Sequence, residues 1–389
     1  LEVIGPDGDV LPSTVIISDD GLDRSLQFMA SPVQSLGTAL FHLRPGDREA
    51  TTSLHHDGFT IENRHLRVSV DPESGNIASI YDKEQGREVL IGGEQGNVIQ
   101  LHENLPSYWD AWNIGYTGRS WTLDRADSIE LIDRSPLALT VRVRKSFLGL
   151  SKANRAPTEG FPSSFFTQEI TLYADRPQVD MRLEADWWED HTLLKVAFPF
   201  TVNSDVATYE IPYASIRRTT RRDTAAEKAR FEVAVHRWAD ISADEHGISL
   251  LNDSKYGIDT LGSTMRLTGL TSALWPDPMA DRGRQEMAYA VYPHAGSWRE
   301  ARTVERAQEM NLPLFPMVIE PRGGELDGSR SFFAVEGDGV VLAAIKRAED
   351  GEGLVLRLVE SLGKETKGWV TLPGEIDSAV EIDLLERGI

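Results

Sequence analysis

The loop around residue 110 holds the residue types best suited to bind a sugar. Tyr108, Trp109 and Trp112 surround the carboxylate of Asp110, shortly after a proline. Aromatic faces pack against the apolar C–H face of a pyranose ring, and a carboxylate accepts hydrogen bonds from the ring hydroxyls. The structural alternative is that the two tryptophans pack in the core while Asp110 caps a turn. From physics alone the structural interpretation is favoured, because most aromatic side chains are core residues.

A polar turn further along the chain offers a second set of sugar-binding groups. An apolar strand ends at Leu250 and Leu251 and is followed by Asn252, Asp253, Ser254, Lys255, Tyr256 and Gly257. Because Asn and Asp stabilise turns through their own backbone contacts, a plain hairpin is the default interpretation. The functional alternative is that Asn252, Asp253, Lys255 and Tyr256 face a sugar in a cleft, where loops often carry function.

The segment 187–191, Trp-Trp-Glu-Asp-His, follows an alternating strand over residues 179–187. The alternation predicts Trp187 on the buried face and Trp188 at the strand end. His191 has no second histidine at metal-binding spacing, so a structural role is favoured. Glu189 lies two residues from His191, and on one strand the two side chains would share a face. This pair is the only local hint of acid–base chemistry of the kind a sugar epimerase needs.

Several classes of function are excluded by what the chain lacks. It has no cysteine, which rules out disulfides, thiolate zinc sites and cysteine nucleophiles and is compatible with the cytosol. No G-x-S-x-G motif, P-loop or long apolar run is present. The net charge of −21 argues against nucleic acid and anionic membranes as partners. The only tight histidine cluster, His55-His56-Asp57, is predicted to be a solvated linker rather than a metal site.

The pattern along the chain predicts an all-β fold. Alternating, β-branched segments separated by turn residues dominate, and Leu137, Leu139, Val141 and Val143 are predicted to line one face of a strand. One helix is expected near 298–310, because Ser297 and Glu300 form a capping-box pattern and Pro313 ends the run. Polar connections at 45–58 and 319–330 predict three domains, namely a small β-sandwich segment at 1–57, a central unit at 58–318 and a β-sandwich at 319–389.

An ordered series of motifs resembles the C-terminal region of family 38 α-mannosidases, in the cytosolic or vacuolar-type branch. Each piece alone is unspecific, but the order over about residues 58–315 is specific. The series comprises residues 63–77 (NRHLRVSVDPESGNI), 79–83 (SIYDK), 108–112 (YWDAW), 191–196 (HTLLKV), 236–240 (HRWAD), 250–257, 277–283, 289–294 (YAVYPH) and 311–314 (NLPL).

This resemblance implies a retaining exo-α-mannosidase whose aspartate nucleophile, acid/base and zinc ion belong to an N-terminal catalytic domain. The early motif of that domain, in which His and Asp are separated by one residue and followed by Ala-Trp, does not occur in this chain, so no catalytic or metal-binding residue can be carried over. The resemblance also implies a central galactose-mutarotase-like supersandwich flanked by smaller β-sandwich units. The abrupt start at Leu1 indicates a processed chain or a piece of a longer one. No cofactor is expected in this chain, and a cytoplasmic location is expected.

Three hypotheses remain after these observations. The first is a non-catalytic C-terminal portion of an α-mannosidase, with the catalytic domain of the same polypeptide as its partner and the α-mannoside as substrate of the whole enzyme. In it, the loop 108–112 and the turn 252–257 lie at the pocket rim. The second is a self-contained carbohydrate-binding module, and the third is a mutarotase or epimerase-like sugar enzyme. Loss of a large partner domain should also expose an apolar patch on the central unit.

Overall fold

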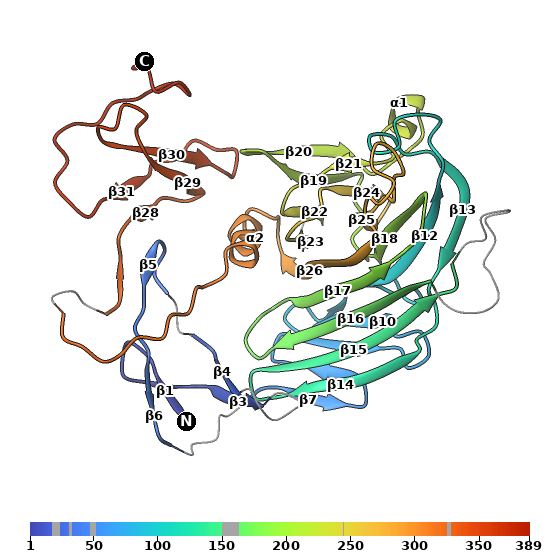
Figure 1. Ribbon diagram of the computed structural model, residues 1–389, viewed down its shortest axis with the longest axis horizontal. Coiled ribbons are helices and arrows are strands. Elements are labelled where there is room, and N and C mark those ends of the chain that lie inside the picture. Colours follow the sequence, from blue (N-terminus) through green and yellow to red (C-terminus); the bar gives the residue numbers. More distant parts are fainter. Residues whose placement is uncertain (18–23, 31–32, 47–51, 150–162, 244, 325–327) are drawn as a thin grey trace. The chain divides into compact units, whose positions relative to one another are not determined.

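The computed structural model describes residues 1–389 except 18–23, 31–32, 47–51, 150–162, 244 and 325–327, and strands dominate it (Figure 1). This confirms the all-β prediction. The chain forms two compact units: unit 1 combines residues 1–51 with 315–389, and unit 2 spans 52–314. The expected first and third domains thus share unit 1, apart from the few residues at each boundary. The division into domains at 57/58 and 318/319 stays a prediction.

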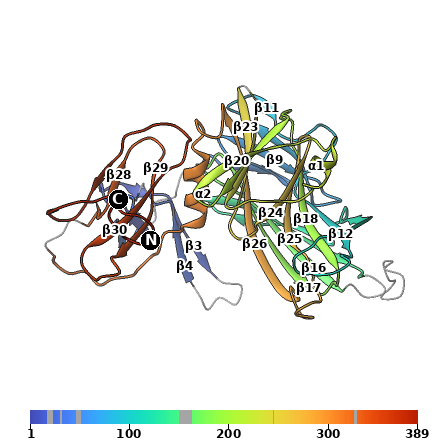
Figure 2. The ribbon, with the colours of Figure 1, turned by 90° about the horizontal axis from the view of Figure 1, so that it is seen from above.

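The largest sheet of unit 2 has nine antiparallel strands, and β17 lies beside β26 in its centre (Figure 2). In order across the sheet, the strands are β14 (Ser128–Arg134), β15 (Ala138–Phe147), β16 (Ser164–Tyr173), β17 (Val179–Trp187), β26 (Gly283–Ala295), β23 (His246–Asn252), β22 (Trp238–Ala243), β19 (Val206–Ile211) and β20 (Ala214–Thr219).

A six-stranded antiparallel sheet carries the loops of interest. Its strands, in order, are β13 (Tyr116–Thr122), β12 (Val98–Asn104), β18 (Thr192–Pro199), β25 (Thr264–Leu270), β24 (Gly257–Leu261) and β21 (Val233–Ala234). All eight residues of β18 are buried, including the polar ones. β18 is therefore a central strand covered on both faces, and its sequence shows no simple alternation.

The alternation predicted for two strands is confirmed. In β15, Leu139, Val141 and Val143 are buried, and Leu137 is buried just before the strand begins. In β17, the buried residues alternate with half-buried or exposed ones and end at Trp187, which is fully buried. The buried apolar side chains of the two strands from Leu139 onward belong to one continuous core that the large sheets of unit 2 share.

The third sheet of unit 2 has five strands: β11 (Arg87–Glu88), β10 (Ile77–Asp82), β9 (Leu66–Val70), β8 (Thr60–Glu62) and β7 (His55–Asp57). The prediction that His55-His56-Asp57 is a linker is wrong, because these residues form the edge strand β7. Their side chains are nevertheless exposed. An edge strand is held by backbone hydrogen bonds to one neighbour and needs no apolar side chains.

Two helices are present among the described residues. α2 (Thr303–Asn311) begins later than the predicted start near 298, and a four-residue helix, α1 (Ala225–Lys228), was not expected. The Ser297 N–H does donate to Glu300 Oε2 at 2.8 Å, but the residues between form turns. Arg302 then adopts a left-handed conformation with φ 56°, so the helix can begin only after it.

Unit 1 is built from short strand pairs and one three-stranded sheet. The three-stranded sheet has the order β2 (Val10–Leu11), β1 (Glu2–Ile4) and β6 (His42–Arg44). The pairs are β3 (Ser13–Ile17) with β4 (Arg24–Phe28), β5 (Gly37–Thr38) with β27 (Arg330–Ser331), β28 (Ala334–Glu336) with β31 (Trp369–Thr371), and β29 (Val340–Arg347) with β30 (Leu354–Glu360).

Candidate sugar-contacting surface

The aromatic loop 105–115 connects β12 to β13 and is closed at its base by hydrogen bonds. The Leu105 N–H donates to Gly115 O at 2.8 Å, and the Gly115 N–H donates to Asn104 Oδ1 at 2.8 Å. A Cβ atom at Gly115 would lie 2.5 Å from Leu105 O, so only glycine allows this close approach. The base of the loop is therefore fixed by backbone packing.

The tip of the loop is a tight turn centred on Trp109, whose φ is 63°. The backbone N–H groups of Trp112 and Asn113 both donate to Trp109 O at 2.9 Å. The Asn113 side chain donates to Tyr108 O, also at 2.9 Å. Tyr108 is 70% exposed, Trp109 55% and Trp112 66%. The alternative in which both tryptophans pack in the core is therefore wrong.

Trp109, Trp112 and Trp275 form an exposed group that we call the aromatic cluster. Ring centroids lie 5.9 Å apart for Trp109 and Trp112, 5.1 Å for Trp109 and Trp275, and 5.7 Å for Trp112 and Trp275. These separations lie within the range of favourable edge-to-face pairs. Trp275 belongs to the loop between β25 and β26 and is 49% exposed. Two loops distant in sequence thus build one aromatic surface.

Asp110 is held beside the aromatic cluster by His191. His191 Nε2 donates to Asp110 Oδ2 at 2.9 Å, and the Leu274 N–H reaches the same oxygen at 3.4 Å. The hydrogen bond from His191 lowers the pKa of Asp110 below its ordinary value. The carboxylate therefore stays ionised and oriented, as a group that accepts hydrogen bonds from sugar hydroxyls must be.

The backbone of the His191 loop is fixed by two neighbouring loops. The His191 N–H donates to Ser272 O at 2.9 Å, and the Asn104 N–H donates to His191 O at 2.7 Å. Ser272 in turn accepts a hydrogen bond from the buried Trp187 indole at 2.7 Å. Asp281 Oδ2 accepts the Ser272 N–H at 3.0 Å. The three loops therefore form one hydrogen-bonded assembly at this end of unit 2.

Left-handed backbone conformations concentrate in this assembly. Nine described non-glycine residues have positive φ, and four of them are Trp109, His191, Ser272 and Asp281. Such conformations are uncommon for residues with a Cβ atom and gather at binding and active sites. The backbone strain here marks these loops as a candidate functional site.

The turn 252–257 has an evident local structural role. Asn252 is buried; its side chain donates to His236 O at 2.6 Å, and its Oδ1 accepts the Lys255 N–H at 2.8 Å. Asp253 Oδ1 accepts the Ala288 N–H at 3.1 Å, while Tyr256 is 62% exposed and its ring lies near His236. No hydrogen bond or ring contact between described residues links this turn to the aromatic cluster. That the turn 252–257 lies at a pocket rim remains a prediction.

The suggested acid–base pair of Glu189 and His191 is not formed. β17 ends at Trp187 and β18 begins at Thr192, so the two residues lie in a loop rather than on one strand. Glu189 is buried, where its carboxylate accepts hydrogen bonds from Ser163 and Ser164, whereas His191 turns to Asp110. The premise of the epimerase hypothesis is therefore wrong.

Neither a metal cluster nor a membrane span is found in the part of the chain that the structure describes. No three His, Asp or Glu side chains there gather in an arrangement that could hold a metal ion. No helix within the same residues is long and apolar enough to cross a bilayer. The described residues thus do not fit the zinc ion implied by the family resemblance.

Two members of the site were missed from the sequence. His191 was expected to be structural, yet it orients the carboxylate of Asp110. Trp275 was not singled out, although an aromatic residue in a proline-containing loop between two strands is a usable signal. Sequence spacing could not reveal that these loops meet. His191 lies 81 residues from Asp110, and Leu274, the neighbour of Trp275 that also contacts Asp110, lies 164 residues from it.

Comparison with known proteins agrees with the fold and the loop motifs. Residues 61–279 match the glycosyl hydrolases family 38 C-terminal domain, and residues 339–389 match the glycosyl hydrolases family 38 C-terminal beta sandwich domain. The chain therefore belongs to glycosyl hydrolase family 38, of which it contains C-terminal domains. The resemblance seen in the sequence is confirmed.

Relatives that match most of the chain are named α-mannosidases. Human alpha-mannosidase 2C1 is 35% identical to this chain, and the match covers 84% of this chain and 31% of the human protein. An alpha-mannosidase of Saccharomyces cerevisiae is 28% identical, and the match covers 88% of this chain and 33% of the yeast protein. The chain thus spans about a third of the length of these relatives. The crystal structure of an alpha-mannosidase from Enterococcus faecalis superimposes with a TM-score of 0.75 at 14% identity, covering 92% of this chain and 45% of that one. This likeness shows the shared fold.

Proposed function

We propose that the chain is the non-catalytic C-terminal portion of a retaining exo-α-mannosidase, which hydrolyses terminal α-mannosides. In this proposal the β units support the catalytic domain of the same polypeptide, and the aromatic loop contributes to the rim of its pocket. The observation that carries the proposal is the exposed aromatic cluster beside the oriented Asp110 carboxylate. The relatives named α-mannosidases supply the substrate class.

The chemistry of the surface supports a contact with substrate or with the catalytic domain. Exposed aromatic groups of this kind mark interaction sites, because a soluble protein otherwise buries large apolar side chains. Such a patch was expected if a large partner domain covers the central unit. A carboxylate held by His191 supplies the polar contact that gives a mannoside its orientation.

The proposal places a zinc ion in the catalytic domain of the parent enzyme and assigns none to the described residues of this chain. The ion is expected in the catalytic domain, where it would bind the hydroxyls of mannose, and no step is assigned to it among the described residues. A cytoplasmic location is also part of the proposal, supported by the absence of cysteine. Fractionation of cells that express the parent protein would test the location.

Activity measurements test the supporting role directly. The chain alone should give no turnover of an aryl α-mannoside in the presence of zinc. In the parent polypeptide, Trp109→Ala should raise KM or lower kcat/KM by about tenfold, as expected for loss of an aromatic contact with the substrate. Trp188→Ala is the matched control, because Trp188 is 49% exposed but outside the aromatic cluster.

Two results would overturn the proposal. Turnover by the chain alone that persists through repurification would show that it holds a catalytic centre. Equal kinetics of the parent and its Trp109→Ala variant would remove the aromatic loop from the pocket rim, while leaving the family assignment intact.

The second candidate function is a self-contained carbohydrate-binding module, which the same exposed aromatic cluster favours. Calorimetric titration of the chain with mannose and α-mannobiose distinguishes the two. We expect no binding, because a surface that forms only part of a pocket offers too few contacts. Millimolar or tighter binding that Trp109→Ala abolishes would favour the module instead.

A further inference from the structure

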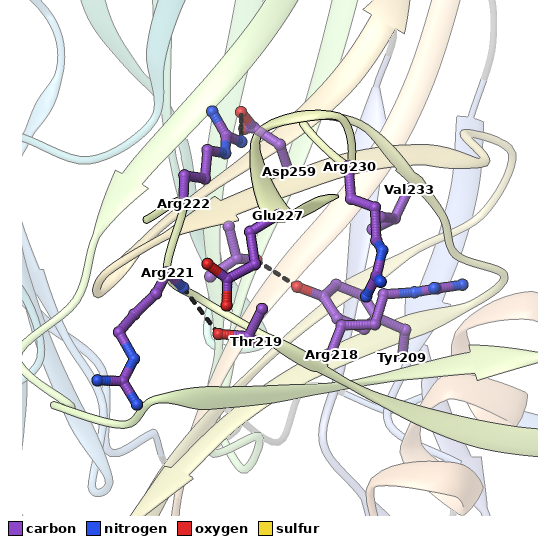
Figure 3. A pocket seen from close by; sticks show the side chains of 10 residues that line it. Tyr209, Arg218, Thr219, Arg221, Arg222, Glu227, Arg230, Val233 and Asp259 are labelled. Atoms are coloured by element: carbon purple, nitrogen blue, oxygen red, sulfur yellow. Dashed lines mark hydrogen bonds and ion pairs between the residues drawn. The ribbon is translucent and has the colours of Figure 1, made fainter. Parts of the chain in front are cut away.

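A crevice rich in arginine lies where β19, β20 and β24 meet the loop that contains α1 (Figure 3). Its walls include four arginines but only two carboxylates, Glu227 and Asp259. The arginines are Arg218, Arg221, Arg222 and Arg230. This local excess of positive charge stands out in a chain whose net charge is −21.

Both carboxylates of the crevice are already engaged. Asp259 accepts hydrogen bonds from Arg222 and Arg266, each with a 2.8 Å contact. Glu227 caps α1, because its Oε2 accepts the backbone N–H groups of Asp223 at 3.0 Å and Thr224 at 2.8 Å. Arg221 forms an exposed ion pair with Asp205 at 3.0 Å.

Two guanidinium groups of the crevice, those of the half-buried Arg218 and the exposed Arg230, make no contact of this kind with another described residue. Arg218 Nε is buried and makes no hydrogen bond. Within the described part of the chain, neither Arg218 nor Arg230 has a side-chain hydrogen bond or an ion pair. Figure 3 shows both side chains on the same side of the crevice, beside the ring of Tyr209. A buried donor with no acceptor is rare in folded proteins, since such groups are nearly always satisfied.

We propose that Arg218 and Arg230 bind an oxyanion, of the phosphate or phosphomonoester class. A guanidinium group presents its N–H donors in a planar fork that matches the oxygens of such anions, and two neighbouring forks bind different oxygens. The bound anion satisfies the orphaned Nε of Arg218 and offsets the repulsion between the two cations. The overall negative charge does not prevent binding, because distant charges are screened beyond about 8 Å at physiological ionic strength.

Calorimetric titration of the whole chain with sodium phosphate tests the site, in a buffer free of other oxyanions and at constant ionic strength. Arg218→Gln and Arg230→Gln should each weaken binding by about tenfold. Both variants should fold, because neither side chain makes a hydrogen bond or an ion pair with another described residue. The matched control is Arg217→Gln: Arg217 directly precedes Arg218 on β20 but lines a different groove, and its replacement changes the net charge equally. The control should bind phosphate as the wild type does.

The source of the phosphoryl group is distinguished by a second titration with glycerol 3-phosphate. Tighter binding than that of inorganic phosphate assigns a phosphomonoester ligand, and equal binding assigns the free ion. Phosphate binding that is absent from the wild type, or that all three variants weaken equally, overturns the proposal. The mannosidase proposal does not depend on either outcome, because the crevice shares no residue with the aromatic cluster.

Discussion

Replacing Lys195 with methionine should destabilise the sheet that carries the aromatic loop. Lys195 lies on β18, directly between β12 and β25, and its side chain is fully buried. Its ammonium group donates to Glu232 Oε2 at 2.6 Å and to Thr268 Oγ1 at 2.8 Å, and lies 3.7 Å from Asp259. Methionine fills a similar volume but removes the charge. Glu232 then loses its cation, whereas Asp259 keeps two arginines.

The size of the effect follows from the burial of the pair. Removing one partner of a buried ion pair costs about 3–5 kcal/mol, because the other charge remains buried without compensation. In a domain of this size that loss lowers Tm by roughly 6–20 °C. Lys83→Met is the matched control: Lys83 also pairs with a glutamate, Glu62, but both side chains are about 30% exposed. Its loss should cost less than about 1 kcal/mol.

The cost of Lys195→Met should also depend on pH. Burial raises the pKa of Glu232 above its ordinary value even with Lys195 present, and removing Lys195 raises that pKa further. A carboxyl whose pKa is raised on folding contributes stability below its unfolded pKa, and this contribution is lost as pH rises through the folded pKa. The difference between the variant and the wild type should therefore be large at pH 8 and smaller near pH 5.

Denaturant unfolding at pH 8 and pH 5 measures both quantities. The double variant Lys195→Met with Glu232→Gln should recover much of the loss at pH 8, because no buried charge is left unpaired. A loss within 1 kcal/mol of that of Lys83→Met would refute the reasoning. So would a double variant that is no more stable than Lys195→Met alone.

Three further predictions concern the core and the loop. Burial lowers the pKa of Lys145 from 10.5 to about 8. Between pH 8 and pH 10.5 the unfolded chain therefore binds a proton at Lys145 that the folded chain does not, and the free energy of unfolding should rise with pH. Unfolding curves should show a rise of about 3 kcal/mol over this range in the wild type and no rise from this source in Lys145→Met. Gly115→Ala should cost about 1–3 kcal/mol and change the near-ultraviolet circular dichroism, because its Cβ would press on Leu105 O, whereas Gly92→Ala, in open space, should do neither. Trp275→Ala should reduce the same spectral signal and cost about 1–3 kcal/mol, since two ring contacts are lost; an unchanged spectrum would contradict the aromatic cluster.

The strands were predictable where one face meets the core and the other meets solvent. Alternation over residues 137–143 and 179–187 identified β15 and β17, because a period of two is imposed by the pleat. Boundaries that depend on backbone geometry were not predictable. The Ser297 to Glu300 hydrogen bond forms as its pattern suggests, but the left-handed Arg302 delays the helix. A short polar edge strand such as β7 carries no side-chain signal at all.

Only the part of the candidate site that is contiguous in the chain could be predicted from the sequence. The local motif around Trp109 and Asp110 was visible, because its residues are adjacent in the chain. Whether the tryptophans face the core or solvent was not readable, since both orientations suit an aromatic residue. His191 and Trp275 come from other loops, and only the pairing of β12 with β18 and of β18 with β25 brings these loops together.

The arrangement of the site argues for function more strongly than its composition does. Core packing would explain Trp109 and Trp112 if they were buried, but both are more than half exposed. A solvated turn would need no distant partner, yet Asp110 is held by His191 from another loop. Each left-handed non-glycine residue costs on the order of 1 kcal/mol, and four of them stand in these loops. Loops that expose aromatic rings, fix a carboxylate and retain strained backbone are built to meet another surface, and in this family we propose that surface to be the mannoside pocket.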